Sequence, residues 1–188
     1  MNLITLPEVA STSTWLKENC ATLPHGTVAL THNQTAGRGQ RGNSWEAAPG
    51  MNLTFSLLLR PEGLRPACQF LMSQIVSMAV TDALRSFLDR CVPPELITVK
   101  WPNDIYVGNS KIAGILIEHS ITGASIQHSV VGIGLNVNQT EFLSDAPNPV
   151  SMAALANRSF PLDAVLDRIV TPLIAAVYDD PDGEIARR

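Results

Sequence analysis

The stretch Gln34-Thr-Ala-Gly-Arg-Gly-Gln-Arg-Gly-Asn-Ser-Trp45 holds three glycines, two arginines, three side-chain amides and a tryptophan in twelve residues. Glycine lets the backbone approach a ligand closely, and the planar guanidinium of arginine suits phosphate or carboxylate. A tryptophan at the end of such a stretch can stack on an aromatic ring. A hydrophobic core needs none of these features, so the stretch predicts an anion-binding loop.

The residues that follow this loop decide which fold can carry it. The pattern Gly-x-Gly-x-x-Gly at residues 37–42 fits a dinucleotide-binding fingerprint only where a helix opens at the glycines. Pro49 and Gly50 would break such a helix within two turns. A P-loop needs a lysine where this chain has Asn43. Both the Rossmann fold and the P-loop are therefore excluded, and arginine side chains on the loop are expected to hold the anion.

The composition is that of one compact domain with a sizeable core, because 45% of the 188 residues are hydrophobic and 16% are charged. A net charge of −4 without a long basic run argues against binding to nucleic acid. No run of 18 apolar residues occurs, so no association with a membrane is expected. Three widely spaced cysteines favour a reducing compartment, hence a cytoplasmic location. The four histidines lack ligand spacing, so no metal site is expected.

Hydrophobic periodicity predicts strands at residues 2–9, 27–31, 52–60, 97–101, 105–107, 111–119 and 129–137. It predicts helices at residues 11–19 and 66–90, and an apolar helical stripe over residues 162–177 that Pro172 should kink. In the third strand, Leu53, Phe55, Leu57 and Leu59 fall on one face. A run of strands with helices before and after it predicts an α+β fold with a mixed, largely antiparallel sheet flanked by helices.

A second polar motif, Lys100-Trp-Pro-Asn-Asp104, lies between two predicted strands. Proline, asparagine and aspartate all form turns, so a purely structural role is one reading of this segment. Lys111 and Glu118 place two more charges on the next, otherwise apolar strand. A lysine at the start of a strand can simply be exposed, but four charges among apolar strands also favour a site.

A third motif, Val131-Gly-Ile-Gly-Leu-Asn136, places glycines inside a predicted strand. Glycine weakens a strand unless a ligand or another backbone needs the space. Asn136 and Asn138 follow with amides that could read the edge of a base. The three motifs together predict a slot floored by glycines, with cations at one end and asparagines at the other. Such a slot suits a small carboxylic acid beside ATP.

The motifs and the order in which they occur along the chain resemble those of the bacterial biotin protein ligases, within the biotin/lipoate ligase superfamily. The resemblance covers roughly residues 1–180 and rests on Ser11-Thr12, Gln34-Thr-Ala-Gly-Arg-Gly-x-x-Gly-x-x-Trp45, Lys100-Trp-Pro-Asn-Asp104, Lys111-x-Ala-Gly-Ile-Leu-x-Glu118 and Gly132-x-Gly-x-Asn136. Each motif alone is weak, whereas their combination is highly specific.

The resemblance implies a catalytic fold like that of the class II aminoacyl-tRNA synthetases, and two half-reactions. The carboxylate of biotin attacks the α-phosphorus of ATP, which is bound with Mg2+ as co-substrate, to give biotinyl-5′-AMP and pyrophosphate. A lysine on the biotin carboxyl carrier domain of acetyl-CoA carboxylase, or of a related carboxylase, then attacks this mixed anhydride. No covalent enzyme nucleophile is needed, so catalysis would come from positioning and charge stabilisation.

The resemblance also implies roles for individual residues. Lys111 would bridge the biotin carboxylate and the α-phosphate, and Arg38 would act beside it as the second catalytic cation. The implied biotin-binding residues are Ser11, Thr12, Gln34, Gly37, Arg38, Gly39, Lys111, Gly114, Gly132 and Gly134. The implied nucleotide-binding residues are Arg41, Trp45, Lys100, Asn103, Asp104 and Asn136, with Trp45 packing on the adenine.

Two departures from the family pattern bear on these expectations. Position 40 is glutamine where many members carry a second loop arginine, and the adjacent Arg41 is a candidate to replace it. The expected organisation is a single catalytic domain over residues 1–188, without an N-terminal DNA-binding domain and without the small C-terminal β-barrel common in bacterial members.

Two other functions remain open from the sequence. A lipoate or octanoyl ligase or transferase of the same superfamily would bind a bare aliphatic chain, whereas Ser11, Thr12 and Gln34 favour a polar ureido ring. A non-catalytic biotin-binding module would bind without releasing pyrophosphate. The oligomeric state is also open, and a homodimer is one of its alternatives.

Overall fold

The computed structural model describes residues 1–143 and 148–178, except for the side chain of Arg41. The strands are β1 (Asn2–Leu6), β2 (Thr27–Thr31), β3 (Leu53–Leu59), β4 (Ile97–Lys100), β5 (Asp104–Val107), β6 (Ser110–Thr122) and β7 (Ser125–Leu135). The helices are α1 (Thr12–Asn19), α2 (Phe70–Leu88), α3 (Met152–Ala156) and α4 (Leu162–Tyr178). Short 3-10 turns cover Gln40–Gly42, Pro66–Cys68 and Pro94–Leu96.

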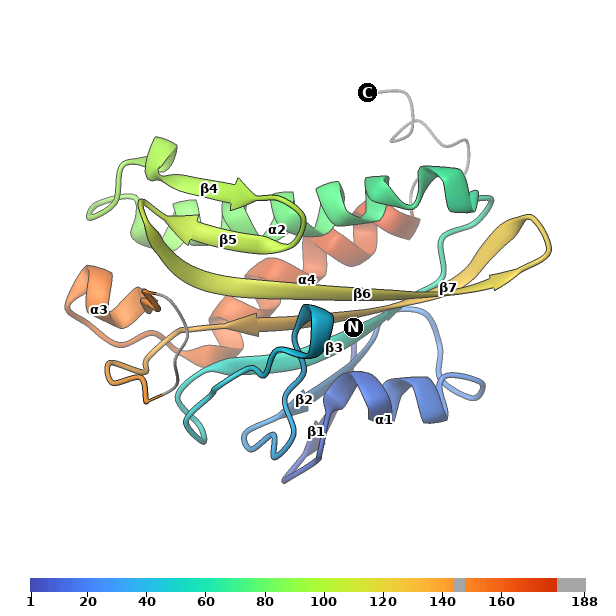
Figure 1. Ribbon diagram of the computed structural model, residues 1–188, viewed down its shortest axis with the longest axis horizontal. Coiled ribbons are helices and arrows are strands. Elements are labelled where there is room, and N and C mark those ends of the chain that lie inside the picture. The colour runs from blue at the N-terminus through green and yellow to red at the C-terminus, as the bar shows by residue number, and fades with distance from the viewer. Residues whose placement is uncertain (144–147, 179–188) are drawn as a thin grey trace.

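The strands form one seven-stranded sheet in the order β1-β2-β3-β7-β6-β5-β4. β1 and β2 pair in parallel, and every other neighbouring pair is antiparallel. The long hairpin of β6 and β7 crosses the middle of the molecule (Figure 1). The mixed, largely antiparallel sheet predicted from the sequence is confirmed.

The two faces of the sheet carry different layers. Helices α2 and α4 cover one face, and α1 lies on the other face beside the β1–β3 edge (Figure 1). On β3, Leu53, Phe55, Leu57 and Leu59 belong to the main core on the α2–α4 side, as predicted. Leu58 instead packs with Leu16 of α1. Because side chains alternate along a strand, Thr54 and Ser56 share the α1 face, which leaves polar groups there for a site.

Helix α2 is a core helix, although residues Pro66–Leu88 are long and apolar enough to cross a membrane by length and composition. Met72, Val76, Val80 and Leu84 are almost completely buried in the main core. Each such side chain contributes about 1.5–3 kcal/mol on leaving water. Helix α4 packs against α2 over the same core.

The predicted elements are present, with boundaries that differ by a few residues. The last hairpin is longer than its alternating pattern indicated, because β6 and β7 continue in pairing to Thr122 and Ser125. Helix α4 runs through Pro172 as one element. The short helix α3 was not predicted. Ser151 caps it by accepting a hydrogen bond from the Ala154 N–H at 3.1 Å.

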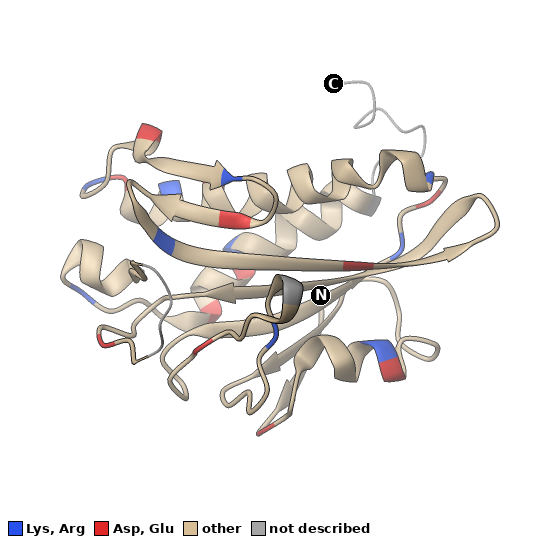
Figure 2. Ribbon diagram, in the orientation of Figure 1, with Lys and Arg blue, Asp and Glu red and all other residues tan. Residues whose placement is uncertain are grey.

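Charged residues are spread over the fold. Figure 2 shows positive and negative residues interspersed along the described chain rather than gathered on one element. Two of these residues from the α1 face, Arg38 and Glu118, contribute to the site described next.

Candidate active site

A cavity of about 290 Å3 opens on the α1 face of the sheet. It brings together residues from all three sequence motifs. Of the predicted site residues, its lining contains Ser11, Thr12, Gln34, Arg38, Gly39, Trp45, Asn103, Asp104, Lys111, Gly114, Gly132 and Gly134. Segments more than a hundred residues apart in the chain therefore converge on one concave surface.

Among the described side chains, four predicted residues do not line this cavity. Gly37 lines an adjoining hollow beneath the loop, together with Glu118. Lys100 is exposed, and its Nζ lies 3.5 Å from the hydroxyl of Tyr106. Asn136 is buried next to the cavity floor, at the end of β7. The side chain of Arg41 lies outside the described part of the structure. The fourth, Asn138 from the third motif, makes hydrogen bonds through both its amide nitrogen and its amide oxygen to the backbone of Phe160, each at 2.9 Å.

The glycine loop forms a small hairpin and not the start of a helix. The Gly39 N–H donates to the Asn43 carbonyl at 2.7 Å, and the Trp45 N–H donates to the Gly37 carbonyl at 3.1 Å. A Cβ at position 37 would lie 2.6 Å from the Trp45 carbonyl oxygen, so only glycine allows this closure. The sequence-based exclusion of a Rossmann fingerprint is confirmed.

A buried amide fixes the chain just after Trp45. The Oε1 of Gln139 accepts hydrogen bonds from the Ala48 N–H at 2.9 Å and from Asn52 Nδ2 at 2.6 Å. Asn52 in turn accepts the Val137 N–H at 2.9 Å. These bonds tie the end of the loop to the end of β7. No local pattern predicted them, because each position shows only a polar residue.

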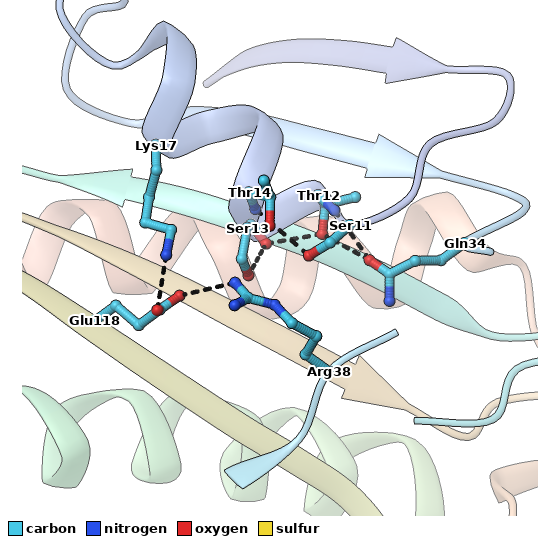
Figure 3. A network of polar contacts seen from close by, with 9 residues as sticks. Ser11, Thr12, Ser13, Thr14, Lys17, Gln34, Arg38 and Glu118 are labelled. Carbon is cyan, nitrogen blue, oxygen red and sulfur yellow. Dashed lines mark hydrogen bonds and ion pairs between the residues drawn. The ribbon is translucent and has the colours of Figure 1, made fainter. Parts of the chain in front are cut away.

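One end of the cavity is uncharged and rich in hydrogen-bonding groups. The Thr12 N–H and Oγ1 both donate to Gln34 Oε1, at 2.9 and 3.3 Å. The side chain of Ser11 caps α1 by accepting the Thr14 N–H at 3.4 Å. Ser13 adds another hydroxyl to this end of the lining (Figure 3). Behind it, the buried hydroxyl of Ser56 lies 2.8 Å from both Ser13 Oγ and Thr12 Oγ1, and the sequence motifs identified neither serine. This end suits a neutral polar ring.

The other end contains two cations, each paired with a carboxylate. Lys111 Nζ lies 2.7 Å from Asp104 Oδ1, an ion-pair contact that is not aligned as a hydrogen bond. Arg38 Nη2 lies 3.4 Å from Glu118 Oε2, and the other oxygen of Glu118 is 2.7 Å from Lys17 Nζ (Figure 3). Of the four charges expected to cluster, only Lys111 and Asp104 pair with each other; Glu118 pairs with Arg38 and Lys17, and Lys100 lies outside both groups.

The floor of the cavity is a row of glycines on two adjacent strands. Gly114 of β6 pairs with Gly134 of β7, and Gly132 follows on the same face. A Cβ at Gly132 would lie 2.6 Å from Ser13 Oγ, and one at Gly134 would lie 2.5 Å from Trp45 Nε1. The missing side chains therefore make room for Ser13 and for the indole of Trp45.

Two buried polar atoms beside this floor have no hydrogen-bond partner in the described residues, Trp45 Nε1 and Asn136 Oδ1. One is a donor and the other an acceptor. Burying such groups unpaired costs about 1–3 kcal/mol each. Unpaired atoms at a cavity are the kind that a ligand satisfies.

Residues 6–136 match the model of the Biotin/lipoate A/B protein ligase family. The chain belongs to the biotin/lipoate A/B protein ligase family. It is 41% identical over 108 residues to a biotin–[acetyl-CoA-carboxylase] ligase of Paracoccus denitrificans, covering 57% of this chain and 43% of that protein. It is 36% identical over 138 residues to the chloroplastic biotin–protein ligase 1 of Arabidopsis thaliana, covering 72% of this chain and 36% of that protein.

A solved member of the family has the same fold. The biotin protein ligase of Aquifex aeolicus, in complex with biotin and ATP, matches with a TM-score of 0.77 and 30% identity, over 95% of this chain and 71% of that one. The sheet and its flanking helices thus correspond to a biotin protein ligase catalytic domain, whose fold is that of the class II aminoacyl-tRNA synthetases. The matched region spans about two fifths of the length of the curated relatives.

Proposed function

We propose that residues 1–188 form the catalytic domain of a biotin protein ligase, which activates biotin with ATP and transfers it to a lysine of a carrier protein. One observation carries the proposal. A single cavity joins a neutral hydrogen-bonding end, built on Gln34 and Thr12, to a cationic end built on Lys111 and Arg38. Biotin has that polarity, with a ureido ring at one end and a carboxylate at the other.

In the first half-reaction, a carboxylate oxygen of biotin attacks the α-phosphorus of ATP. The bond from that phosphorus to the pyrophosphate oxygen breaks, and an acyl phosphate anhydride forms. Two anions must approach each other, so fixed cations are needed to offset their repulsion. Lys111 and Arg38 take this role by exchanging Asp104 and Glu118 for the carboxylate and the phosphate. Their resting ion pairs keep both cations at the site before ligands arrive.

On the nucleotide side, Trp45 offers the face of its indole to adenine. Asn136 Oδ1, buried without a partner in the described residues, can accept a hydrogen bond from the exocyclic amine of adenine. Asn103 is held at the cavity wall by a hydrogen bond from its Nδ2 to the Ile115 carbonyl at 3.0 Å. The described residues contain no group of three His, Cys, Asp or Glu that could hold a metal ion. Asp104 is the acidic side chain in the cavity lining, and it would be available to a magnesium ion bound to the triphosphate.

In the second half-reaction, the ε-amine of the carrier lysine attacks the acyl carbon of biotinyl-5′-AMP. The acyl–oxygen bond breaks, AMP leaves, and an amide forms with loss of one proton from the amine. The name of the Paracoccus relative supports the carrier domain of acetyl-CoA carboxylase, or of a related carboxylase, as the partner. The three cysteines are unpaired in the structure, which supports a reducing compartment such as the cytoplasm.

The test is pyrophosphate release from ATP in the presence of biotin, compared with lipoate and octanoate. The proposal expects release with biotin alone of the three acids, and none without an acid. Release with lipoate or octanoate but not with biotin would assign the chain to the other branch of the family. Tight biotin binding without pyrophosphate release would make it a binding module.

A further inference from the structure

Trp101 lies at the rim of the cavity with most of its surface in water. It contributes to the cavity lining, yet 74% of the residue is exposed. Trp15 and Trp45, in contrast, are both partly buried. Among the described residues, the indole of Trp101 makes no hydrogen bond and no ring contact. A packed tryptophan buries about 150–250 Å2, so the fold leaves a large apolar surface of this side chain without a partner in the described residues.

The turn that carries Trp101 is held in place. It joins Lys100 and Asp104, the last pair of residues in the β4–β5 hairpin. Asn103 anchors the turn to β6, because its Nδ2 donates to the Ile115 carbonyl at 3.0 Å and its carbonyl accepts the Ile115 N–H at 2.8 Å. A side chain on a fixed turn loses little freedom when a partner packs on it, which favours binding.

A positive charge lies next to this indole. Lys100 is exposed, and its Nζ lies 4.9 Å from the centre of the Tyr106 ring. It forms no ion pair with the described residues. We call Trp101, Lys100 and Tyr106 the rim patch. Because β4 is the last strand of the sheet, the rim patch lies at a free edge where a protein can approach it (Figure 1).

The rim patch lies beside the cationic end of the cavity, where the acyl phosphate anhydride would form. Asp104 follows Trp101 by three residues, and its Oδ1 lies 2.7 Å from Lys111 Nζ. The acceptor amine must reach this end of the cavity, and only a four-carbon stem joins it to the backbone of the carrier. The residues that flank the acceptor lysine must therefore come to the rim. A contact with a bound nucleotide would instead need the indole to turn into the cavity.

We propose that Trp101 is a positioning residue for the second half-reaction, and that its indole packs on an apolar side chain next to the acceptor lysine of the carrier protein. Lys100 completes the contact by pairing with a carboxylate of the same partner. This inference rests on the proposed function and deepens it, since it names a surface that recognises the carrier. Tryptophan and tyrosine are enriched among the residues that carry most of the binding energy at protein interfaces, whereas an exposed charge mainly steers association.

The experiment follows one round of transfer from a chain loaded with biotinyl-5′-AMP. One acceptor is the carrier domain of an acetyl-CoA carboxylase, and the other is Nα-acetyl-lysine amide, which has the same amine without the surrounding protein. Trp101→Ala should lower the second-order rate constant for the carrier domain about tenfold or more and leave that for the small acceptor within about twofold of the wild type. Trp101→Phe keeps a ring and should lose less. Leu3→Ala shortens an exposed apolar side chain on β1, at the opposite edge of the sheet, and should change neither rate constant.

Lys100→Gln tests the electrostatic part of the contact on the same loaded chain, so that the binding of ATP does not enter the measurement. Transfer to the carrier domain should be about two- to fivefold slower than in the wild type at low ionic strength. The difference should shrink in about 0.5 M salt, because salt screens exposed charges. If Trp101→Ala does not fold, Trp101→Phe and the salt dependence of Lys100→Gln decide.

Three results overturn the inference while leaving the proposed function in place. The first is a wild-type chain that transfers biotin to the carrier domain no faster than to the small acceptor. The second is a Trp101→Ala variant that slows both acceptors alike. The third is a Trp101→Ala variant that raises the KM for ATP in pyrophosphate release and transfers to the carrier domain at the wild-type rate, which would assign the indole to the nucleotide. A wild-type chain that releases no pyrophosphate with biotin overturns the proposed function, and this inference with it.

Discussion

The indole ring of Trp45 lies over Gly134, in the space that a side chain at position 134 would fill. The contact joins the end of the glycine loop to the central strand of the sheet. Lys111 Nζ also lies 5.7 Å from the centre of the same indole, within the range of a cation–π contact. The loop, the glycine floor and Lys111 are therefore packed against one another through the indole of Trp45.

Gly134→Ala should displace Trp45 from the cavity floor, because the new methyl carbon would lie 2.5 Å from Trp45 Nε1, well inside the van der Waals contact distance. With Trp45 as the only tryptophan, in a Trp15→Phe, Trp101→Phe background, its emission should shift to the red and the KM for ATP should rise several-fold. Gly114→Ala is the graded comparison, since its Cβ would lie 3.1 Å from the indole and should perturb it less. Unchanged emission in Gly134→Ala would contradict the packing described.

Lys111→Ala should lower single-turnover pyrophosphate release by about 10²–10³-fold and weaken biotin binding only modestly. A contact that strengthens as negative charge develops in the transition state affects the rate of adenylate formation more than the affinity for biotin. Calorimetry gives the affinity and rapid quench gives the rate. Arg90→Ala removes an exposed cation just after α2, outside the cavity lining, and should leave both quantities nearly unchanged. An unaltered rate in Lys111→Ala would remove that residue from its role.

Glu118→Gln should make the loop more open to trypsin when ligands are absent. The carboxylate of Glu118 joins Arg38 of the loop to Lys17 of α1. Because exposed ion pairs contribute up to about 1 kcal/mol, cleavage after Arg38 should be about two- to fivefold faster. Biotin with ATP should suppress cleavage in the wild type and the variant alike, since the bound anions order the loop. Glu95→Gln, a change far from the loop, serves as the control; equal cleavage in all three chains would argue against the tether.

Gln40→Arg should slow the escape of biotinyl-5′-AMP. Gln40 lines the cavity, and a neutral hydrogen bond is about half as strong as a charge-assisted one. The release rate is measured by trapping free adenylate after one turnover. Gln69→Arg adds the same charge at the start of α2, outside the cavity lining, and should have no effect. Equal release from Gln40→Arg and wild type would show that position 40 does not retain the intermediate.

Three histidines should make the fold less stable in mild acid. Burial lowers the pKa of His25, His119 and His128 below 6.5, and the charge of Arg60 lowers it further for His25 and His128. The unfolded chain therefore binds protons more readily, so stability is fully present above about pH 6.5 and falls as the pH drops toward the lowered values.

Urea unfolding at pH 7.5 and pH 5.5 measures this loss. His25 accepts the Arg60 N–H at Nδ1, at 2.9 Å. His25→Asn keeps an acceptor there but does not titrate, so its stability should fall less between the two pH values. The same loss in the variant and the wild type would rule out His25 as a contributor.

Local patterns were enough to predict the described strands, helices α1, α2 and α4, and about half of the cavity lining. The alternation of Leu53, Phe55, Leu57 and Leu59 could identify the core face of β3, because burial imposes that period directly. The glycines inside β7 predicted the floor of the cavity, because glycine weakens a strand unless the space is needed for close approach. The loop motif named Arg38 and Trp45, whose chemistry is unusual for a core.

Contacts between side chains that lie far apart in the sequence could not be predicted from such local patterns. Nothing in the local sequence connects Ser56 to Ser13, or Glu118 to Arg38, because these contacts depend on strand register and on the position of α1. The glycines were expected to clear space for a ligand, whereas Gly132 and Gly134 also admit side chains of the chain itself. Asn138 was predicted to contact a ligand, but the fold brings it next to the backbone of Phe160, which takes both of its amide groups.

Strand β7 pairs with β3 on one side and β6 on the other, so it alone joins the two halves of the sheet. The residues of the neutral end lie on the half made first, and Asp104 and Lys111 lie on the half made second. During synthesis on the ribosome, the site therefore cannot assemble until β7, the last of the described strands, has left the exit tunnel. A nascent chain shorter than this has no pocket through which biotin or ATP could promote its folding.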